Sequence, residues 1–163
     1  MILIKTSKGN IKLKLDTKNT PITANNFLSY VRSDFYKDTI FHRVINGFMI
    51  QGGGLTEALE TKKTNPPIKN EAKKAQKNKK GTIAMARTMD KDSATAQFFI
   101  NLVDNAFLNY SNDSAQGAGY CVFGEVVEGM DVVDSIAKVK TGQKKDHADV
   151  PLEAIMINEI TEI

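Results

Sequence analysis

The chain has 163 residues, of which 41% are hydrophobic and 25% charged, and its formal net charge is +3. This composition is typical of one globular domain, and the small excess of lysine and arginine does not by itself indicate a nucleic-acid or membrane partner. A single cysteine excludes an intramolecular disulfide, and two histidines are too few for the clusters that hold structural zinc. We therefore expect a single domain over residues 1–163, without a metal or cofactor.

The first residues predict a β-hairpin. Apolar and charged side chains alternate in Ile11–Asp16, which is the period of a strand with one buried face, and Ile2, Ile4 and Thr6 show the same period. The polar turn Ser7–Asn10 contains a glycine and joins the two runs. No basic segment with a following apolar run precedes this hairpin, and no long apolar run occurs later, so we expect a cytoplasmic protein that does not enter a membrane.

A helix follows the hairpin, and short strands follow the helix. Thr20 is a candidate N-cap and Pro21 suits the first helical position. The apolar residues at helical spacing are Ala24, Phe27, Leu28 and Val31. Further along, short runs rich in β-branched and aromatic residues, separated by glycines, predict strands. They cover residues 39–44, 48–51, 82–87, 98–102 and 120–127.

A long irregular segment separates the strand near Gln51 from the strand near Ile83. It carries many lysines against few acids, namely Lys62, Lys63, Lys69, Lys73, Lys74, Lys77, Lys79 and Lys80. A lysine run usually forms a solvated loop surface, and this one lacks the arginines and interleaved aromatics that bind nucleic acid. We do not expect a nucleic-acid partner. The alternative is a surface for nucleic acid or for an acidic partner, which binding that weakens with added salt would reveal.

The C-terminal part predicts one more helix and a closing strand. The helix begins after Gly129, where Asp131 suits the positive end of the helix dipole. Its apolar stripe comprises Met130, Val132, Val133, Ile136 and Ala137. Residues 154–163 read as the last strand. Two helices among about eight strands, without alternation of strands and helices, predict a largely antiparallel barrel or sandwich.

Two familiar chemistries are not supported. Neither histidine accompanies the Gly-x-Ser-x-Gly turn of a hydrolase, and Cys121 lies in a predicted strand. The run Gly52-Gly53-Gly54 lacks the following Lys-Ser/Thr and helix of a phosphate-binding loop. We interpret these glycines as a bend or a close backbone approach at the end of a strand.

Strand alternation instead places two apolar side chains, two glutamines and one arginine on strand faces that can meet on the outside of a barrel. They are Arg43, Met49, Gln51, Gln97 and Phe99. Taken singly, each fits an ordinary core or surface position. His42 alternates to the face opposite Arg43, so we expect it to be structural.

The order of residues in two segments resembles the cyclophilins. These segments are residues 41–53, Phe-His-Arg-Val-Ile-Asn-Gly-Phe-Met-Ile-Gln-Gly-Gly, and residues 96–100, Ala-Gln-Phe-Phe-Ile. The resemblance continues at residues 25–27, 81–86, 122–126 and 129–133, and is closest to the small bacterial cytoplasmic members. It implies an eight-stranded antiparallel closed barrel capped by two α-helices. It also implies a peptidyl-prolyl cis/trans isomerase that assists protein folding without a cofactor.

The same resemblance implies roles for individual residues. Arg43 takes the catalytic position, and Gln51 holds the prolyl carbonyl side and steers Arg43. The proline pocket comprises Phe48, Met49, Phe99 and Leu108. The backbone of Arg87, with neighbours Ala86 and Thr88, pairs with the residue before the proline, and Gln97 lines the adjoining surface. The implied partners are proline-containing peptides and flexible or unfolded segments, bound by a monomer.

This sequence departs from the best-known eukaryotic pattern in its pocket. Phe107 replaces a tryptophan and Tyr120 replaces a histidine, so the resemblance implies weak binding of cyclosporin A, because phenylalanine lacks the indole donor. The stretch from Arg87 to Ala96 is also one residue longer. A binding module with the same fold but no turnover is the rival hypothesis, and the retained Arg43 argues against it.

Overall fold

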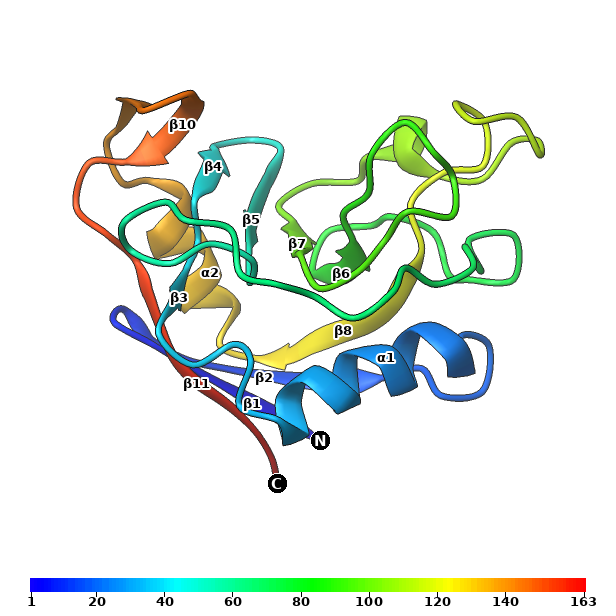
Figure 1. Ribbon diagram of the computed structural model, residues 1–163, viewed down its shortest axis with the longest axis horizontal. Helices are drawn as coiled ribbons and strands as arrows, with labels where there is room; N and C mark the ends of the chain where they lie inside the picture. Colours follow the sequence, from blue (N-terminus) through cyan, green and yellow to red (C-terminus); the bar gives the residue numbers. More distant parts are fainter.

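Nine strands form one antiparallel sheet in the computed structural model, which describes residues 1–163 (Figure 1). They are β1 (Ile2–Thr6), β2 (Gly9–Leu15), β3 (Thr39–Ile40), β4 (Arg43–Ile45), β5 (Met49–Gly52), β6 (Thr82–Met85), β7 (Phe98–Asn101), β8 (Val122–Glu128) and β11 (Met156–Glu162). Their order is β3-β11-β1-β2-β8-β6-β7-β5-β4. A separate hairpin comprises β9 (Thr141–Lys144) and β10 (His147–Pro151). The helices are α1 (Pro21–Arg32), α2 (Met130–Ala137) and the short 3-10 turn η1 (Ala106–Leu108).

The sheet curls until its two ends meet. The amide of Ile40 in β3 donates to the carbonyl of Leu55 at 3.1 Å, and the amide of Gly53 donates to the carbonyl of Ile40 at 3.3 Å. These bonds join β3 to the segment that continues β5. The predicted antiparallel cyclophilin-like fold with two helices is therefore confirmed, but the sheet is strongly curled and no regular ladder joins its two end strands.

The number of strands differs from the expected eight because the predicted strand over residues 39–44 is broken. Its first part, β3, pairs with β11, and its last part, β4, pairs with β5. The chain changes partner at Phe41 and His42, where the Phe41 amide donates to the carbonyl of Ile155 at 3.0 Å. The hairpin β9–β10 was not predicted, because its residues are mostly polar and lack apolar alternation.

One cluster of 25 buried residues fills the space inside the sheet. The alternating residues of the first hairpin point into it, as the strand period predicts, and both helices add their apolar stripes. Phe27 of α1 lies at its aromatic centre, with ring centroids 5.3 Å from Tyr36, 5.8 Å from Phe98 and 5.0 Å from Phe123. This packing fixes α1 against the strands that carry the site. None of the helices has the length and apolar character needed to cross a bilayer.

The start of α1 is not capped as predicted. The hydroxyl of Thr20 donates to the carbonyl of Asp16 at 2.7 Å, so it makes no cap bond to the helix. The carboxylate of Glu71 accepts from the amides of Ile22 and Thr23 instead, at 3.3 and 2.7 Å. A side chain from the lysine-rich segment therefore supplies the negative charge that suits a helix N-terminus.

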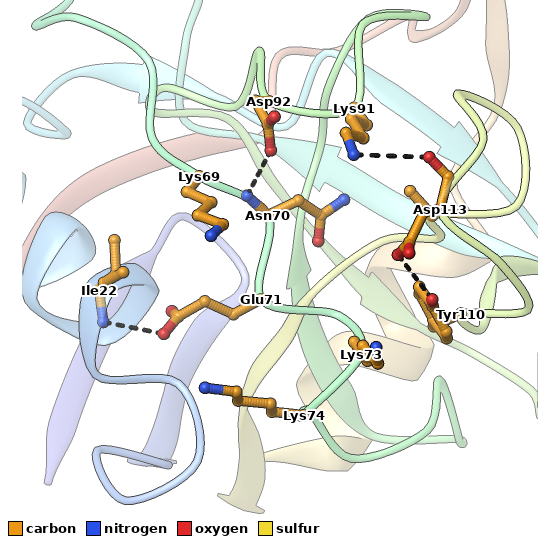
Figure 2. A pocket seen from close by; sticks show the side chains of 11 residues that line it. Ile22, Lys69, Asn70, Glu71, Lys73, Lys74, Lys91, Asp92, Tyr110 and Asp113 are labelled. Carbon is orange, nitrogen blue, oxygen red and sulfur yellow. Dashed lines mark hydrogen bonds between the residues drawn. The ribbon is translucent and has the colours of Figure 1, made fainter.

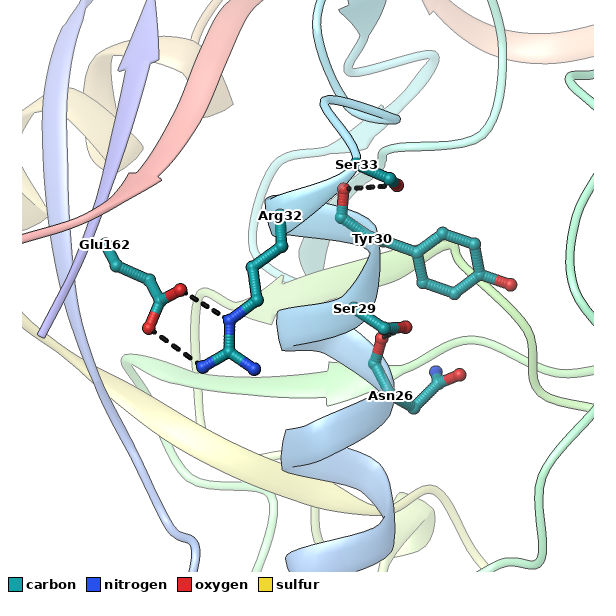
Figure 3. A network of polar contacts seen from close by, with 6 residues as sticks. All are labelled: Asn26, Ser29, Tyr30, Arg32, Ser33 and Glu162. Carbon is teal, nitrogen blue, oxygen red and sulfur yellow. Dashed lines mark hydrogen bonds and ion pairs between the residues drawn. The ribbon is translucent and has the colours of Figure 1, made fainter.

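The other end of α1 is tied to the last strand. Arg32 donates two hydrogen bonds to the carboxylate of Glu162 in β11, at 2.7 and 3.2 Å (Figure 3). Both side chains are exposed, so this ion pair contributes little to stability.

Candidate active site

A pocket of about 300 Å³ lies outside the barrel, where β4, β5 and β7 face η1. Ten residues line it: Arg43, Phe48, Met49, Gln51, Ala86, Arg87, Phe99, Phe107, Leu108 and Tyr120. All ten are among the residues for which the resemblance implies a role. Thr88 and Gln97, the two others, line an adjoining hollow of about 160 Å³ that shares Gln51, Ala86 and Arg87 with the pocket. The structure therefore brings the whole implied set together in one continuous groove.

The floor of the pocket is apolar and well packed. A second small cluster of buried residues lies beneath it, comprising Met49, Ala84, Phe99, Leu108 and Val122. At the rim, Phe107 is 74% exposed and stacks on Phe48, with ring centroids 5.7 Å apart. A flat apolar ligand the size of a proline ring suits such a floor, because burial of its surface needs shape rather than polar partners.

Strand register places Arg43 beside two glutamines at one edge of the pocket. Arg43 of β4 is directly opposite Gln51 of β5, so their side chains share a face. Arg43 Nη1 donates to Gln51 Oε1 at 3.3 Å, and Gln51 Nε2 donates to Gln97 Oε1 at 3.0 Å. No carboxylate forms an ion pair with Arg43. The guanidinium is thus oriented by a neutral amide and keeps most of its donors for a ligand.

His42 lies on the opposite side of the strand, as the alternation predicts. It is buried, and its ring lies 6.0 Å from that of His147 in an edge-to-face arrangement. Burial, followed by the charges of His147 and Arg43, lowers the pKa of His42 to about 4. His42 is therefore neutral near pH 7 and does not reach the pocket, which it does not line.

Arg87 holds one wall of the pocket with its side chain, a role that reasoning from the sequence missed. Its guanidinium donates to the carbonyls of Gly119, Thr88 and Ala115, each at 2.9 Å. The same group lies 4.6 Å from the ring centroid of Tyr120. Neither the backbone amide nor the carbonyl of Arg87 is bound within the chain, so both are free to pair with a peptide.

Three buried asparagines, also missed, hold the floor from behind. Asn101 donates to Asn78 and Thr82 at 3.0 and 2.9 Å, and Asn105 donates to Asn101 at 2.8 Å. This network reaches three pocket residues through their backbone carbonyls: Asn105 donates to Phe48, and Asn78 donates to Leu108 and Tyr120. The one signal in the sequence was Asn101, a polar residue within the otherwise apolar predicted strand 98–102, and it does not indicate its partners.

Comparisons with known proteins decide the family. Residues 1–162 match the family model described as cyclophilin type peptidyl-prolyl cis-trans isomerase/CLD. The chain belongs to the cyclophilin family. It is 56% identical to peptidyl-prolyl cis-trans isomerase B of Escherichia coli (strain K12), over 99% of this chain and 98% of that protein. It is 54% identical to the isomerase cyp18 of Streptomyces antibioticus, over 94% and 93%.

Solved structures agree. A cyclophilin type isomerase of Cryptosporidium parvum, determined in the presence of the dipeptide Ala-Pro, matches with a TM-score of 0.78 and 25% identity, over 98% of this chain and 96% of that one. The chain is therefore a peptidyl-prolyl cis-trans isomerase with the cyclophilin fold, and proline-containing peptides are the ligands of its family. The rival hypothesis of a binding module without turnover has no support from these relatives.

Proposed function

We propose that Arg43 of this cyclophilin catalyses rotation about Xaa-Pro bonds by donating a hydrogen bond to the prolyl nitrogen. The bond resists rotation because the nitrogen lone pair is delocalised into the carbonyl, which gives a barrier of about 18–20 kcal/mol. In the twisted transition state the lone pair is localised on nitrogen and can accept a hydrogen bond. A guanidinium placed there stabilises the twisted state more than either planar isomer.

The observation that carries this proposal is the position of Arg43. It lies on the rim of the apolar pocket, bound by Gln51 and by no carboxylate. The proline ring would occupy the floor over Met49, Phe99 and Leu108, while the free backbone of Arg87 pairs with the residue before it. Thr88 and Gln97 would bound the side toward that preceding residue. Backbone pairing explains how one pocket accepts many flanking sequences.

Replacement of Arg43 tests the proposal. We expect Arg43→Ala to lower kcat/KM for a short Ala-Pro peptide by about 100- to 1000-fold, the usual cost of one transition-state donor. Arg43→Lys should recover little, because an ammonium cannot present the same planar pair of donors. Protease-coupled or NMR exchange measurements give the rates.

The matched control for this experiment is Arg32→Ala. Arg32 is also exposed, but it pairs with Glu162 and lines neither part of the groove. Its loss should leave kcat/KM unchanged. Full activity in Arg43→Ala would rule out the proposed role.

We further propose that the enzyme acts as a monomer in the cytoplasm on flexible segments of other proteins. Two observations support this: the sheet curls on itself within one chain, and the only cysteine, Cys121, is buried and forms no disulfide. Size-exclusion chromatography with light scattering, and fractionation of cells, give the measurements. A stable dimer or a secreted enzyme would contradict it.

A further inference from the structure

A second pocket, larger than the catalytic one at about 390 Å³, opens on the same side of the molecule as the start of α1 (Figure 2). Four lysines line it: Lys69, Lys73, Lys74 and Lys91. We call it the lysine pocket. Figure 2 shows Lys69 and Lys74 on the side where Glu71 meets α1, and Lys73 and Lys91 on the side of Tyr110 and Asp113.

The carboxylates in the lining are already bound by other donors. Glu71 is buried and accepts from the amides at the start of α1 and from the Thr23 hydroxyl, the last at 2.7 Å. Asp92 accepts from the Asn70 amide at 2.9 Å, and Asp113 accepts from the Tyr110 hydroxyl at 2.6 Å. That hydroxyl, followed by the charges of Lys73 and Lys91, lowers the pKa of Asp113. Each acid in the lining therefore already has a donor within the protein, and the four lysines exceed the three acids by one charge.

The lysines, by contrast, have donors to spare. None of the four lies within ion-pair distance of a carboxylate. Lys91 makes one long bond of 3.4 Å to the carbonyl of Asp113, and Lys73 lies 5.9 Å from the ring of Tyr110. Residues 62–80 hold eight lysines and a single acid, Glu71. Each ammonium has three donors, so this surface is both positive and rich in unused hydrogen-bond donors.

The lysine pocket and the catalytic pocket share one wall. The carbonyl of Gly119 accepts from Asn70 of the lysine pocket and from Arg87 of the catalytic pocket, each at 2.9 Å. Its neighbours divide in the same way, because Ala118 lines the lysine pocket and Tyr120 lines the catalytic one. A substrate peptide bound in the catalytic pocket would therefore reach the lysine pocket if it extended across this wall.

We propose that the lysine pocket binds carboxylate side chains of the substrate itself, so that the enzyme prefers prolines flanked by acidic residues. The proposal rests on the proposed function of the catalytic pocket. A polypeptide fits better than a nucleic acid, because the lining has no arginine and its single aromatic ring, Tyr110, has its hydroxyl bound to Asp113. The lining acids also disfavour closely spaced phosphates, whereas a peptide can place single carboxylates between them.

Paired peptide substrates test the preference. One carries an Ala-Pro bond with four glutamates after a short spacer, and its twin carries four glutamines; a second pair has the tail before the proline. We expect the wild-type enzyme to show about tenfold higher kcat/KM for an acidic peptide at low salt, through KM, since each exposed ion pair adds a modest amount. Added salt should remove the difference.

Two variants, each with four lysines changed to glutamine, separate the effect of the lysine pocket from the effect of net charge. The pocket variant changes the four lysines of the lysine pocket, and the control variant changes four exposed lysines elsewhere. The pocket variant should lose the acidic preference and keep the wild-type rate on the glutamine twin, which also shows that it is folded. The control variant should keep the preference. The first changes Lys69, Lys73, Lys74 and Lys91 to glutamine, and the second changes the exposed Lys8, Lys37, Lys138 and Lys140 to glutamine.

A binding measurement independent of catalysis completes the test. A proline-free oligoglutamate peptide, titrated into the wild-type protein, should shift the NMR signals of residues 69–74 and 91 but not those of the pocket variant. Equal kcat/KM for both peptide twins, or tighter binding of a single-stranded oligonucleotide than of oligoglutamate at these residues, would overturn the proposal. Failure to isomerise any of the peptides would contradict the proposed function instead, and the oligoglutamate titration would then decide on the lysine pocket alone.

Discussion

Among single residues, Arg87 shows how a side chain that never touches the reacting bond can shape a site. Its three hydrogen bonds end on carbonyls of three different residues, and its flat face lies against Tyr120. Tyr120 in turn meets Phe99 edge to face, with ring centroids 5.8 Å apart. One guanidinium therefore holds a loop and a ring that together form a wall of the pocket proposed to bind proline.

Loss of that wall should affect binding more than turnover. We expect Arg87→Ala to raise KM for an Ala-Pro peptide by about tenfold with little change in kcat, because three hydrogen bonds, one of them partly buried, are lost while Arg43 is untouched. Arg87→Lys should restore only part of the affinity, since lysine cannot bind three carbonyls at once. Progress curves over a range of peptide concentrations separate the two constants, and an unchanged KM would show that the wall holds without Arg87.

Phe107 offers a second test at this scale. Its ring is exposed at the rim, so a larger ring fits there without repacking the floor. We expect Phe107→Trp to raise the affinity for cyclosporin A by about tenfold, the worth of one added indole hydrogen bond, and to leave kcat/KM for peptides within about twofold. Inhibition titrations give the affinity. Equal inhibition of both proteins would mean that the rim residue does not limit the binding of cyclosporin A.

The sequence predicted those site residues that strand alternation or the resemblance to a family identifies. Alternation places Met49 and Gln51 on one face and Arg43 on the face opposite His42, and the resemblance adds the apolar residues of the floor, but only the strand register shows that Arg43 lies opposite Gln51. The asparagine network was not predictable in this way. Its members, Asn78 and Asn105 among them, come from loops whose paths the local sequence does not set.

At the scale of elements, the end of β5 depends on the missing side chains of its glycines. Gly53 has φ +88°, and a Cβ there would lie 2.5 Å from the ring of Phe98 and 2.9 Å from that of Tyr36. Tyr36 cannot easily retreat, because its hydroxyl donates to the carbonyl of Ala96 at 2.7 Å. The predicted close backbone approach at these glycines is confirmed.

Two glycine-to-alanine changes separate crowding from backbone strain. Gly47 also has a positive φ, of +78°, but a Cβ there meets nothing within 4 Å. We expect Gly47→Ala to lower the free energy of unfolding by about 1 kcal/mol and Gly53→Ala by about 3 kcal/mol, because only the second adds a core clash to the strain. Urea denaturation measures both. Equal losses would mean that the aromatic cluster yields to the extra atom.

The sequence did not predict the hairpin β9–β10 or the break between β3 and β4, because neither has a clear hydrophobic pattern. The strands β9 and β10 contain Lys144, His147 and other polar residues, and their pairing depends on docking against β4 rather than on an apolar face of their own. The break between β3 and β4 has a similar cause, since residues 39–42 are all buried while the hydrogen-bond partner changes from β11 to β5. Tertiary contacts determine both the hairpin and the break, and the local sequence predicts neither.

At the scale of the whole molecule, His42 links stability to pH. Its pKa is lowered to about 4 in the folded protein, whereas an unfolded histidine titrates near its ordinary value of 6.5. Between these values the unfolded chain binds the proton and the folded chain does not. Acidification from about pH 6.5 to 4 therefore destabilises the fold, by up to about 3 kcal/mol from this residue.

The variant His42→Phe should remove this part of the pH dependence. Phenylalanine keeps an aromatic ring and cannot be protonated, so we expect the fall in the free energy of unfolding between pH 7 and 4.5 to be smaller in the variant by about 2 kcal/mol. Urea denaturation at several pH values provides the comparison. Parallel pH profiles for the two proteins would show that protonation of His42 is not the cause.

The pairing of the first strand with the last has a consequence for how the chain acquires its structure. β1 lies between β2 and β11, and the amide of Ile163 donates to the carbonyl of Met1 at 3.0 Å, so the two ends lie side by side (Figure 1). During synthesis β1 and β2 emerge well before β11, the second neighbour of β1. The sheet can therefore be completed only once β11 has also been synthesised, so this folding catalyst itself depends on a strand pairing between residues far apart in its sequence.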